Sequence, residues 1–148
     1  MSSNSSALNR SNSQNVSSKA ILSWEEYGKL IEQLIYQIKE SGVHYDYVYG
    51  IPRGGLIPAV FISNVLDIPM FDPNPVYGTA YQKNLLIVDD ISDTGTSIRQ
   101  SIKSLEVFEW AFLDTATIYK HVKTSVIPRY WIAETDRWVE FPYEKRSI

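Results

Sequence analysis

The sequence predicts an α/β fold in which an open, mostly parallel, twisted sheet is flanked by helices. Segments typical of strands alternate with segments typical of helices, a pattern that indicates βαβ units with right-handed connections. The run Leu85–Val88 is apolar without interruption, as expected of a parallel strand that is buried on both faces. The 148 residues suit one domain, and their 44% hydrophobic and 21% charged side chains are ordinary for a globular protein.

The start of the chain differs in composition from the rest. Residues 1–19 are mostly Ser and Asn, so they cannot bury enough apolar surface to offset the entropy of ordering. We therefore expect a disordered tail at residues 1–19, followed by a single domain at residues 20–148.

Composition also argues against several classes of protein. The chain has no cysteine, which rules out disulfides and thiolate metal sites. Its net charge of −3 and pI near 5.4 argue against a nucleic-acid partner. There is no basic region followed by an apolar run, and no apolar stretch approaches the roughly 20 residues of a membrane span. We expect a cytoplasmic protein with no signal peptide and no membrane span.

The first ordered element is predicted to be a long helix. Ser23 and Glu26 have the spacing of a capping box, which marks a helix start. Ser41 and Gly42 supply a helix stop. Between them, apolar side chains recur at helical spacing; these are Trp24, Tyr27, Ile31, Leu34, Ile35 and Ile38.

The next elements are a strand, a helix and a second strand. Asp46–Ile51 reads as a buried strand, and Leu56–Leu66 reads as a helix. Pro58 is tolerated there because it lies in the first turn. Ile68–Phe71 is predicted to be a short strand. The segment from Asp72 to Lys83 is rich in Pro, Asn and Gly, which indicates a loop.

The second half of the chain continues the alternation. Asn84–Val88 is predicted to be a strand of the parallel sheet. Thr96–Phe108 is predicted to be a helix, because Ile98, Ile102 and Leu105 share one face. Phe112–Tyr119 and Tyr130–Ala133 read as strands, and Thr135–Ile148 reads as mostly irregular.

A segment of acids and small residues joins the strand Asn84–Val88 to the next helix. In an open α/β sheet, ligands bind just beyond the carboxyl ends of the strands. Asp89 and Asp90 repel each other there, so ligand hydroxyls or a metal would favour their coexistence. Small residues let the backbone N–H groups and the helix N-terminus approach a phosphate. The segment therefore predicts a site for a ribose 5-phosphate group, formed by Asp89, Asp90, Asp93, Thr94, Gly95, Thr96 and Ser97. The alternative is that Asp93 or Thr94 caps the helix while both acids are solvated.

This run resembles the phosphoribosyl pyrophosphate (PRPP) signature of type I phosphoribosyltransferases, which have a Rossmann-like fold. The resemblance implies that Asp89 and Asp90 bind the ribose 2- and 3-hydroxyls, directly or through Mg²⁺. It also implies that residues 93–97 hold the 5-phosphate. Asp93 would lie near the purine N7 as the catalytic acid or base.

A glycine-containing loop precedes the helix Leu56–Leu66. The Arg53 guanidinium suits phosphate oxygens, and Gly54 and Gly55 allow unusual backbone angles. Alone, such a turn could be purely structural. The resembled family has its pyrophosphate loop at this place in chain order, often with a non-proline cis peptide. The resemblance therefore implies a pyrophosphate loop made by Pro52, Arg53, Gly54 and Gly55, a catalytic contribution from Arg53, and a cis Pro52–Arg53 bond.

The C-terminal third resembles bacterial and archaeal xanthine-guanine phosphoribosyltransferases. The matching residues are Lys120 at a strand end and the segment Trp138–Glu144. By resemblance, Lys120 would donate to the purine 6-oxygen, Trp138 would stack on the base and Val139 would read its edge. Without that resemblance, Trp138 could pack the core and Lys120 could be solvated. His121 follows Lys120 and could reach the site, although a structural or surface role is expected for it.

The resemblance implies transfer of a 5-phosphoribosyl group from PRPP to a 6-oxopurine, namely guanine, xanthine or hypoxanthine. Pyrophosphate would leave, Mg²⁺ would be the cofactor, and the reaction would serve purine salvage. The family is usually a homo-oligomer, so a dimer or tetramer is expected. Transfer to a pyrimidine or another base is a further alternative.

The segment 72–83 departs from the family pattern. Active members usually carry a long flexible loop there that closes over the site, and this segment is too short for one. Tyr77 and Tyr81 could form a small lid, or a neighbouring subunit could cover the site. A regulatory module that binds PRPP or nucleotides with little or no turnover is the competing hypothesis.

Overall fold

The computed structural model describes residues 19–74 and 80–144 of the chain. The tail expected at residues 1–19 lies outside the described residues except for Lys19, which begins the short strand β1 (Lys19–Ile21). The position of Tyr77 also lies outside them. No helix within the described ranges is long and apolar enough to cross a membrane.

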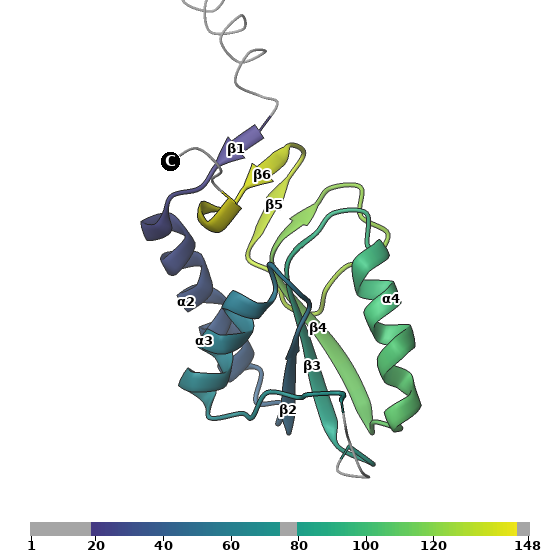
Figure 1. Cartoon of the computed structure of the whole chain (residues 1–148). Coiled ribbons are helices and arrows are strands. Elements are labelled where there is room, and N and C mark those ends of the chain that lie inside the picture. The colour runs from purple at the N-terminus through teal and green to yellow at the C-terminus, as the bar shows by residue number, and fades with distance from the viewer. Residues whose placement is uncertain (1–18, 75–79, 145–148) are drawn as a thin grey trace, which may run out of the picture.

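A four-stranded parallel sheet forms the centre of the domain, with strands in the order β2-β3-β4-β5. Its strands are β2 (Tyr47–Gly50), β3 (Asn84–Ser92), β4 (Phe112–His121) and β5 (Ala133–Thr135). Helices α2 (Trp24–Glu40) and α3 (Leu56–Leu66) cover one face, and α4 (Thr96–Leu105) covers the other (Figure 1). The predicted α/β architecture is confirmed.

Alternation along β3 explains why the sheet has a core on each face. Successive side chains of a strand point to opposite faces. Leu86 and Val88 pack with the buried residues of α2 and α3. Leu85 and Ile87 pack with Ile98 of α4 in a second cluster. The uninterrupted apolar run of β3 is therefore required by burial on both sides.

The predicted helices agree with the structure at their starts. Ser23 and Glu26 form the expected capping box of α2, with both reciprocal hydrogen bonds present. The bounds of α3 are those predicted. The predicted helix 96–108 divides into α4 and a 3₁₀ turn, η1 (Glu106–Phe108).

Several predicted strands differ from the structure. β3 runs on to Ser92, because Asp89 still pairs with Thr117 of β4. The segment 68–71 is not a strand; only Met70 forms an isolated bridge, to Val48. Likewise, Tyr130 forms an isolated bridge, and the strand of this region is β5.

The C-terminal segment, which reads as irregular in the sequence, is partly ordered. β6 (Trp138–Glu140) pairs in parallel with β1, and a 3₁₀ turn, η2 (Pro142–Glu144), follows it. This pair stands at the end of the molecule where β3 and β4 terminate (Figure 1). Both ends of the described chain therefore meet over the carboxyl edge of the sheet.

The described ends of the segment 72–83 lie at the opposite edge. The Gln82 N–H donates to the Glu109 carbonyl (3.0 Å), and the Ala111 N–H donates to the Lys83 carbonyl (2.8 Å). These contacts lie next to the starts of β3 and β4, whereas the paired acids lie near the end of β3. At the usual rise of a strand, Lys83 and Asp89 are about 20 Å apart. Tyr81 is therefore far from the acids, which contradicts its suggested role in a lid.

Candidate active site

The paired acids lie in the last part of β3. Asp89 is buried and Asp90 is half-buried. Asp89 Oδ1 accepts a hydrogen bond from the Asp90 N–H (2.8 Å), and Asp90 Oδ1 accepts one from the Ile91 N–H (2.8 Å). Burial, together with the neighbouring negative charge of Asp90, raises the pKa of Asp89 to about 8. A bound cation, or ligand hydroxyls that donate hydrogen bonds, would therefore stabilise this pair of carboxylates.

A cavity of about 290 Å³ extends from these acids to the start of α4. Gly95 precedes the helix with φ +93°, and a Cβ there would lie 2.8 Å from a methyl of Val126. Gly95 has no side chain that could cap α4, and the Thr94 hydroxyl oxygen accepts a hydrogen bond from the Thr96 N–H (3.3 Å) at the start of the helix. The cavity is lined by Ile51, Pro52, Gly54, Ser97, Ile98 and the whole segment 89–96. It has the features of an anion site: a helix N-terminus, small residues and nearby hydroxyls.

A loop that the sequence did not single out is hydrogen-bonded to the segment that lines this cavity. The Ser125 hydroxyl donates to the Thr94 carbonyl (2.7 Å), and the Ser92 hydroxyl donates to the Val126 carbonyl (2.7 Å). Ser125 and Val126 are distant in sequence from residues 92–97, so no local pattern could have identified them. The contacts fix the position of the segment before α4.

The glycine loop before α3 packs directly on the acids. The Pro52–Arg53 peptide is cis, as expected. A Cβ at Gly54 would collide with the Asp90 carboxylate and would lie 2.8 Å from the Tyr143 hydroxyl oxygen. Pro52 and Gly54 line the cavity between the acids and the start of α4, while Arg53 is exposed. The structure thus brings together the two loops that the sequence singled out.

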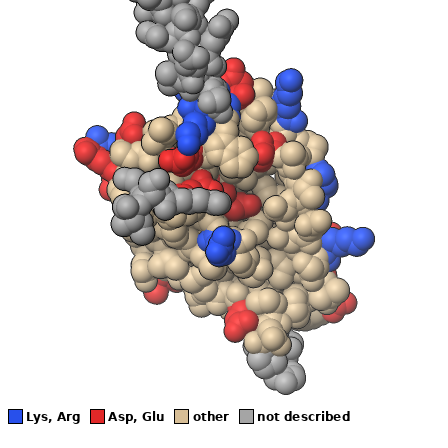
Figure 2. Space-filling model, turned by 45° about the horizontal axis from the view of Figure 1, so that its top comes forward, with Lys and Arg blue, Asp and Glu red and all other residues tan. Residues whose placement is uncertain are grey.

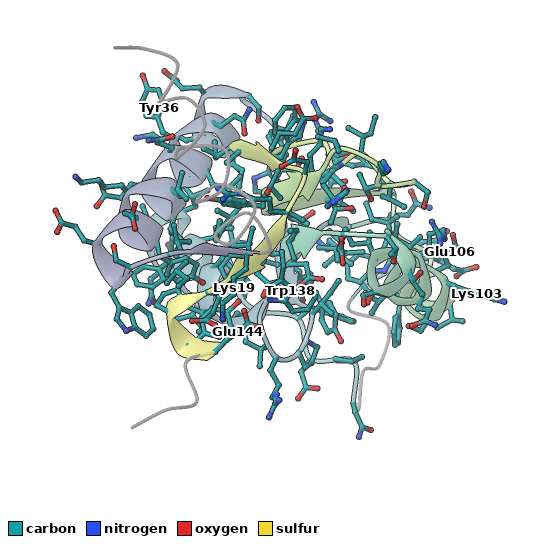
Figure 3. The ribbon with its side chains drawn as sticks, turned by 90° about the horizontal axis from the view of Figure 1, so that it is seen from above. Lys19, Tyr36, Lys103, Glu106, Trp138 and Glu144 are labelled. Carbon is teal, nitrogen blue, oxygen red and sulfur yellow. The ribbon has the colours of Figure 1, made fainter. Side chains whose placement is uncertain are left out.

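A second cavity, of about 250 Å³, adjoins the first. The two share Asp90, Ile91 and Asp93. The rest of the second cavity is lined by His121, Asp136, Arg137, Trp138, Val139, Phe141 and Glu144. Acidic side chains gather around a hollow on this face of the molecule (Figure 2). Figure 3 looks down on it and shows Trp138, Lys19 and Glu144 grouped together.

Trp138 and Val139 occupy different environments in the second cavity. The Trp138 side chain is 62% exposed, so its ring is free to meet a ligand, whereas Val139 is buried. Lys120, by contrast, does not line this cavity. Its Nζ donates to the Glu134 carboxylate and lies 5.0 Å from the centre of the Trp131 ring.

The donor set fits a hard divalent cation. Mg²⁺ prefers oxygen ligands and usually binds through one or two carboxylates, together with water and substrate phosphates. Asp89 and Asp90 offer such a pair, and the raised pKa of Asp89 reflects first its burial and then the like charge of Asp90 beside it. Within the described residues, no group of three or more His, Asp or Glu forms a metal cage. The pair would therefore need ligand oxygens to complete a site.

Comparisons with known proteins place the chain among phosphoribosyltransferases. No family model matches it. A xanthine-guanine phosphoribosyltransferase of Nitratidesulfovibrio vulgaris is 26% identical over 141 residues, covering 83% of this chain and 83% of that one. A purine phosphoribosyltransferase from Pyrococcus horikoshii matches with a TM-score of 0.78 at 30% identity, covering 88% of this chain and 97% of that one. A hypothetical protein from Neisseria gonorrhoeae with bound ppGpp shares the fold, with a TM-score of 0.75 at 22% identity, covering 88% and 91% of the two chains.

The parallel sheet with two adjoining cavities at its carboxyl edge has the type I phosphoribosyltransferase fold. Because the chain is 30% identical to the Pyrococcus enzyme and spans almost all of it, it belongs to the type I phosphoribosyltransferase family. Within that family it resembles the xanthine-guanine phosphoribosyltransferases.

Proposed function

We propose that this protein transfers the 5-phosphoribosyl group of PRPP to a 6-oxopurine base (guanine, xanthine or hypoxanthine) in purine salvage. One observation carries the proposal. The first cavity, which has the features of a phosphate site, adjoins the second cavity, which is lined by the exposed Trp138. Asp90, Ile91 and Asp93 line both cavities. A ribose spanning the shared residues would place its phosphate in one cavity and a base in the other.

Ribose and phosphate recognition would come from β3 and the start of α4. Asp89 and Asp90 would bind the 2- and 3-hydroxyls, and Mg²⁺ would be held by their carboxylate oxygens. When bound, Mg²⁺ would offset negative charge on the pyrophosphate. The backbone of residues 93–97, with the hydroxyls of Thr94, Thr96 and Ser97, would hold the 5-phosphate.

The leaving group would be held by the loop before α3. Pro52, Arg53, Gly54 and Gly55 would bind pyrophosphate, with the Arg53 guanidinium matching two phosphate oxygens. The bond from C1 of the ribose to the pyrophosphate oxygen breaks as a bond from C1 to a purine nitrogen forms. Asp93, which lines both cavities, would exchange the proton of the purine.

Base recognition would come from β4 and β6. Trp138 would stack on the planar base, whose face is apolar, and the backbone of Val139 would read the base edge. The sequence also assigns Lys120 to the 6-oxygen. For that role its ammonium would have to leave the Glu134 carboxylate.

A base panel tests the proposal. The purified chain is incubated with PRPP, Mg²⁺ and, in turn, guanine, xanthine, hypoxanthine, adenine, uracil and orotate. Nucleotide formation with the 6-oxopurines is expected. Product only from uracil or orotate would favour the pyrimidine alternative, and the absence of any nucleotide would overturn the proposed activity.

The second candidate is a regulatory module that binds PRPP or a nucleotide with little or no turnover. The described ends of the segment 72–83 lie at the amino edge of the sheet, far from the acids. One structural neighbour was solved with bound ppGpp. Calorimetry with PRPP, GMP and ppGpp distinguishes the two candidates: tight binding without product supports the module, and robust turnover eliminates it.

We also propose that the protein works as a homo-oligomer in the cytoplasm. α3 carries no charged residue, and its outward side chains Leu56, Val60, Phe61 and Val65 are between 39% and 62% exposed. A contiguous apolar helix face of this kind is typical of a subunit interface. Cell fractionation would test the location.

A further inference from the structure

The end of β4 presents two neighbouring polar side chains, Lys120 and His121. Successive side chains of a strand point to opposite faces, so both cannot face the same cavity. Lys120 is 8% exposed, and its ammonium is held by Glu134 and lies beside the ring of Trp131. Removing a buried ammonium from its carboxylate is costly. The Lys120 side chain therefore lies away from the second cavity, the one proposed above to hold the base and called the base cavity below.

His121 lines the base cavity together with Asp93, Trp138 and Val139. Its Nδ1 accepts a hydrogen bond from the Lys123 backbone N–H (3.1 Å). Because Nδ1 accepts, the neutral imidazole carries its proton on Nε2. The ring is thereby held as the tautomer whose Nε2 is a donor.

We infer that His121, rather than Lys120, donates the hydrogen bond that recognises the oxygen at position 6 of the base. This inference rests on the proposed function and names the residue that sets base selectivity in the same site. A 6-oxo group accepts from Nε2–H, whereas a 6-amino group presents only hydrogens to it. A site built around such a donor rejects the analogue that cannot accept.

Three substitutions test the role. His121→Phe keeps a planar ring and removes the donor, His121→Gln retains an amide N–H, and Lys123→Met changes a neighbouring exposed side chain while keeping its backbone N–H. For His121→Phe, we expect kcat/KM with hypoxanthine to fall at least about tenfold, through KM for the base, while KM for PRPP changes less than about twofold. His121→Gln should recover part of the loss, and Lys123→Met should match the wild type.

Binding measurements separate this inference from the proposed activity. Calorimetry compares IMP with ribose 5-phosphate for each variant, whether or not the protein turns over. His121→Phe should weaken IMP binding at least about tenfold and leave ribose 5-phosphate binding unchanged. Thermal unfolding checks that each variant is folded, and His121→Ala replaces any variant that is not.

Several outcomes overturn the assignment. One is an unchanged KM for hypoxanthine and unchanged IMP binding in His121→Phe. Another is a larger loss in Lys120→Met than in His121→Phe. A third is wild-type protein that binds IMP no more tightly than ribose 5-phosphate. Absence of turnover with a normal His121 effect on IMP binding would reject the proposed activity and leave this inference standing.

Discussion

The Tyr143 hydroxyl donates a hydrogen bond to Oδ2 of Asp90, joining the C-terminal turn η2 to the paired acids of β3. The Tyr143 ring stacks on Phe141 with centroids 5.6 Å apart, and its edge-to-face contact with Tyr27 spans 5.8 Å. Burial and the charge of Asp90 raise the pKa of Tyr143, so it stays a donor. One hydroxyl thus links the acids to the wall of the second cavity.

Loss of that hydroxyl should loosen Asp90. For Tyr143→Phe, which keeps the ring packing, we expect KM for PRPP to rise about three- to tenfold, the net contribution of one typical hydrogen bond. The matched control is Tyr27→Phe, because the Tyr27 hydroxyl is buried without a hydrogen-bond partner among the described residues. Steady-state kinetics of the two variants decide the point. Equal effects would show that Tyr143 acts only through packing.

A side chain at Gly54 should damage the contact between the glycine loop and the acids. The Cβ of Gly54→Ala would collide with the Asp90 carboxylate, so the loop or the acid must shift. We expect PRPP affinity to fall at least about tenfold, measured by calorimetry. Gly28→Ala is the control: a Cβ there meets nothing within 4 Å, and alanine should stabilise α2 by about 0.5–1 kcal/mol. Unchanged PRPP binding by Gly54→Ala would contradict the close packing of Gly54 on the Asp90 carboxylate.

The pKa of Asp89 predicts a pH dependence of stability. Folding raises this pKa from 3.8 to about 8, so the folded state binds the proton more tightly than the unfolded state does. The resulting stabilisation is fully present below about pH 4 and is lost as the pH rises towards 8. Asp89→Asn mimics the protonated form and should gain stability over the wild type as the pH rises.

Urea unfolding in EDTA between pH 4.5 and 8.5 measures that difference. The exposed residue Asp67, which ends α3, supplies the control Asp67→Asn. The prediction is refuted if the difference in the free energy of unfolding between the wild type and Asp89→Asn does not change with pH.

Asp93 should matter for chemistry more than for phosphate binding. Asp93→Asn keeps the shape of the side chain and removes its capacity to exchange a proton. We expect kcat to fall by about 10²-fold or more, the usual contribution of a general acid or base. Ribose 5-phosphate affinity should change little. A parallel loss of binding and turnover would assign Asp93 to ligand binding alone.

The exposed face of α3 predicts a subunit interface. Val60→Asp places a charge among Leu56, Phe61 and Val65 and should convert the oligomer to monomers in sedimentation velocity. Val107→Asp is the matched control, because Val107 is 73% exposed on η1, outside this face. A wild-type protein that is monomeric in the same measurement would contradict the proposed homo-oligomer.

Local signals explain what the sequence could predict. The bounds of α2 and α3 follow from a capping box, apolar spacing and a proline in the first turn, all within a few residues. The acids and the glycine loops were recognisable because ligand sites at strand ends use short segments.

Long-range contacts explain what the sequence could not predict. β6 has only 3 residues and depends on pairing with β1 at the other end of the chain. Lys120 matches a base-binding motif, but its partner Glu134 lies opposite it on the neighbouring strand β5. The Tyr143 contact with Asp90 likewise joins residues that are far apart in sequence. No local pattern encodes these relationships.

The proposed phosphoribosyl transfer is tested by the product stoichiometry of the purified chain with PRPP, hypoxanthine and Mg²⁺. We expect IMP and pyrophosphate to form in equal amounts, and the reaction to require both substrates. Release of pyrophosphate with free ribose 5-phosphate and no IMP, or no consumption of PRPP at all, would contradict it.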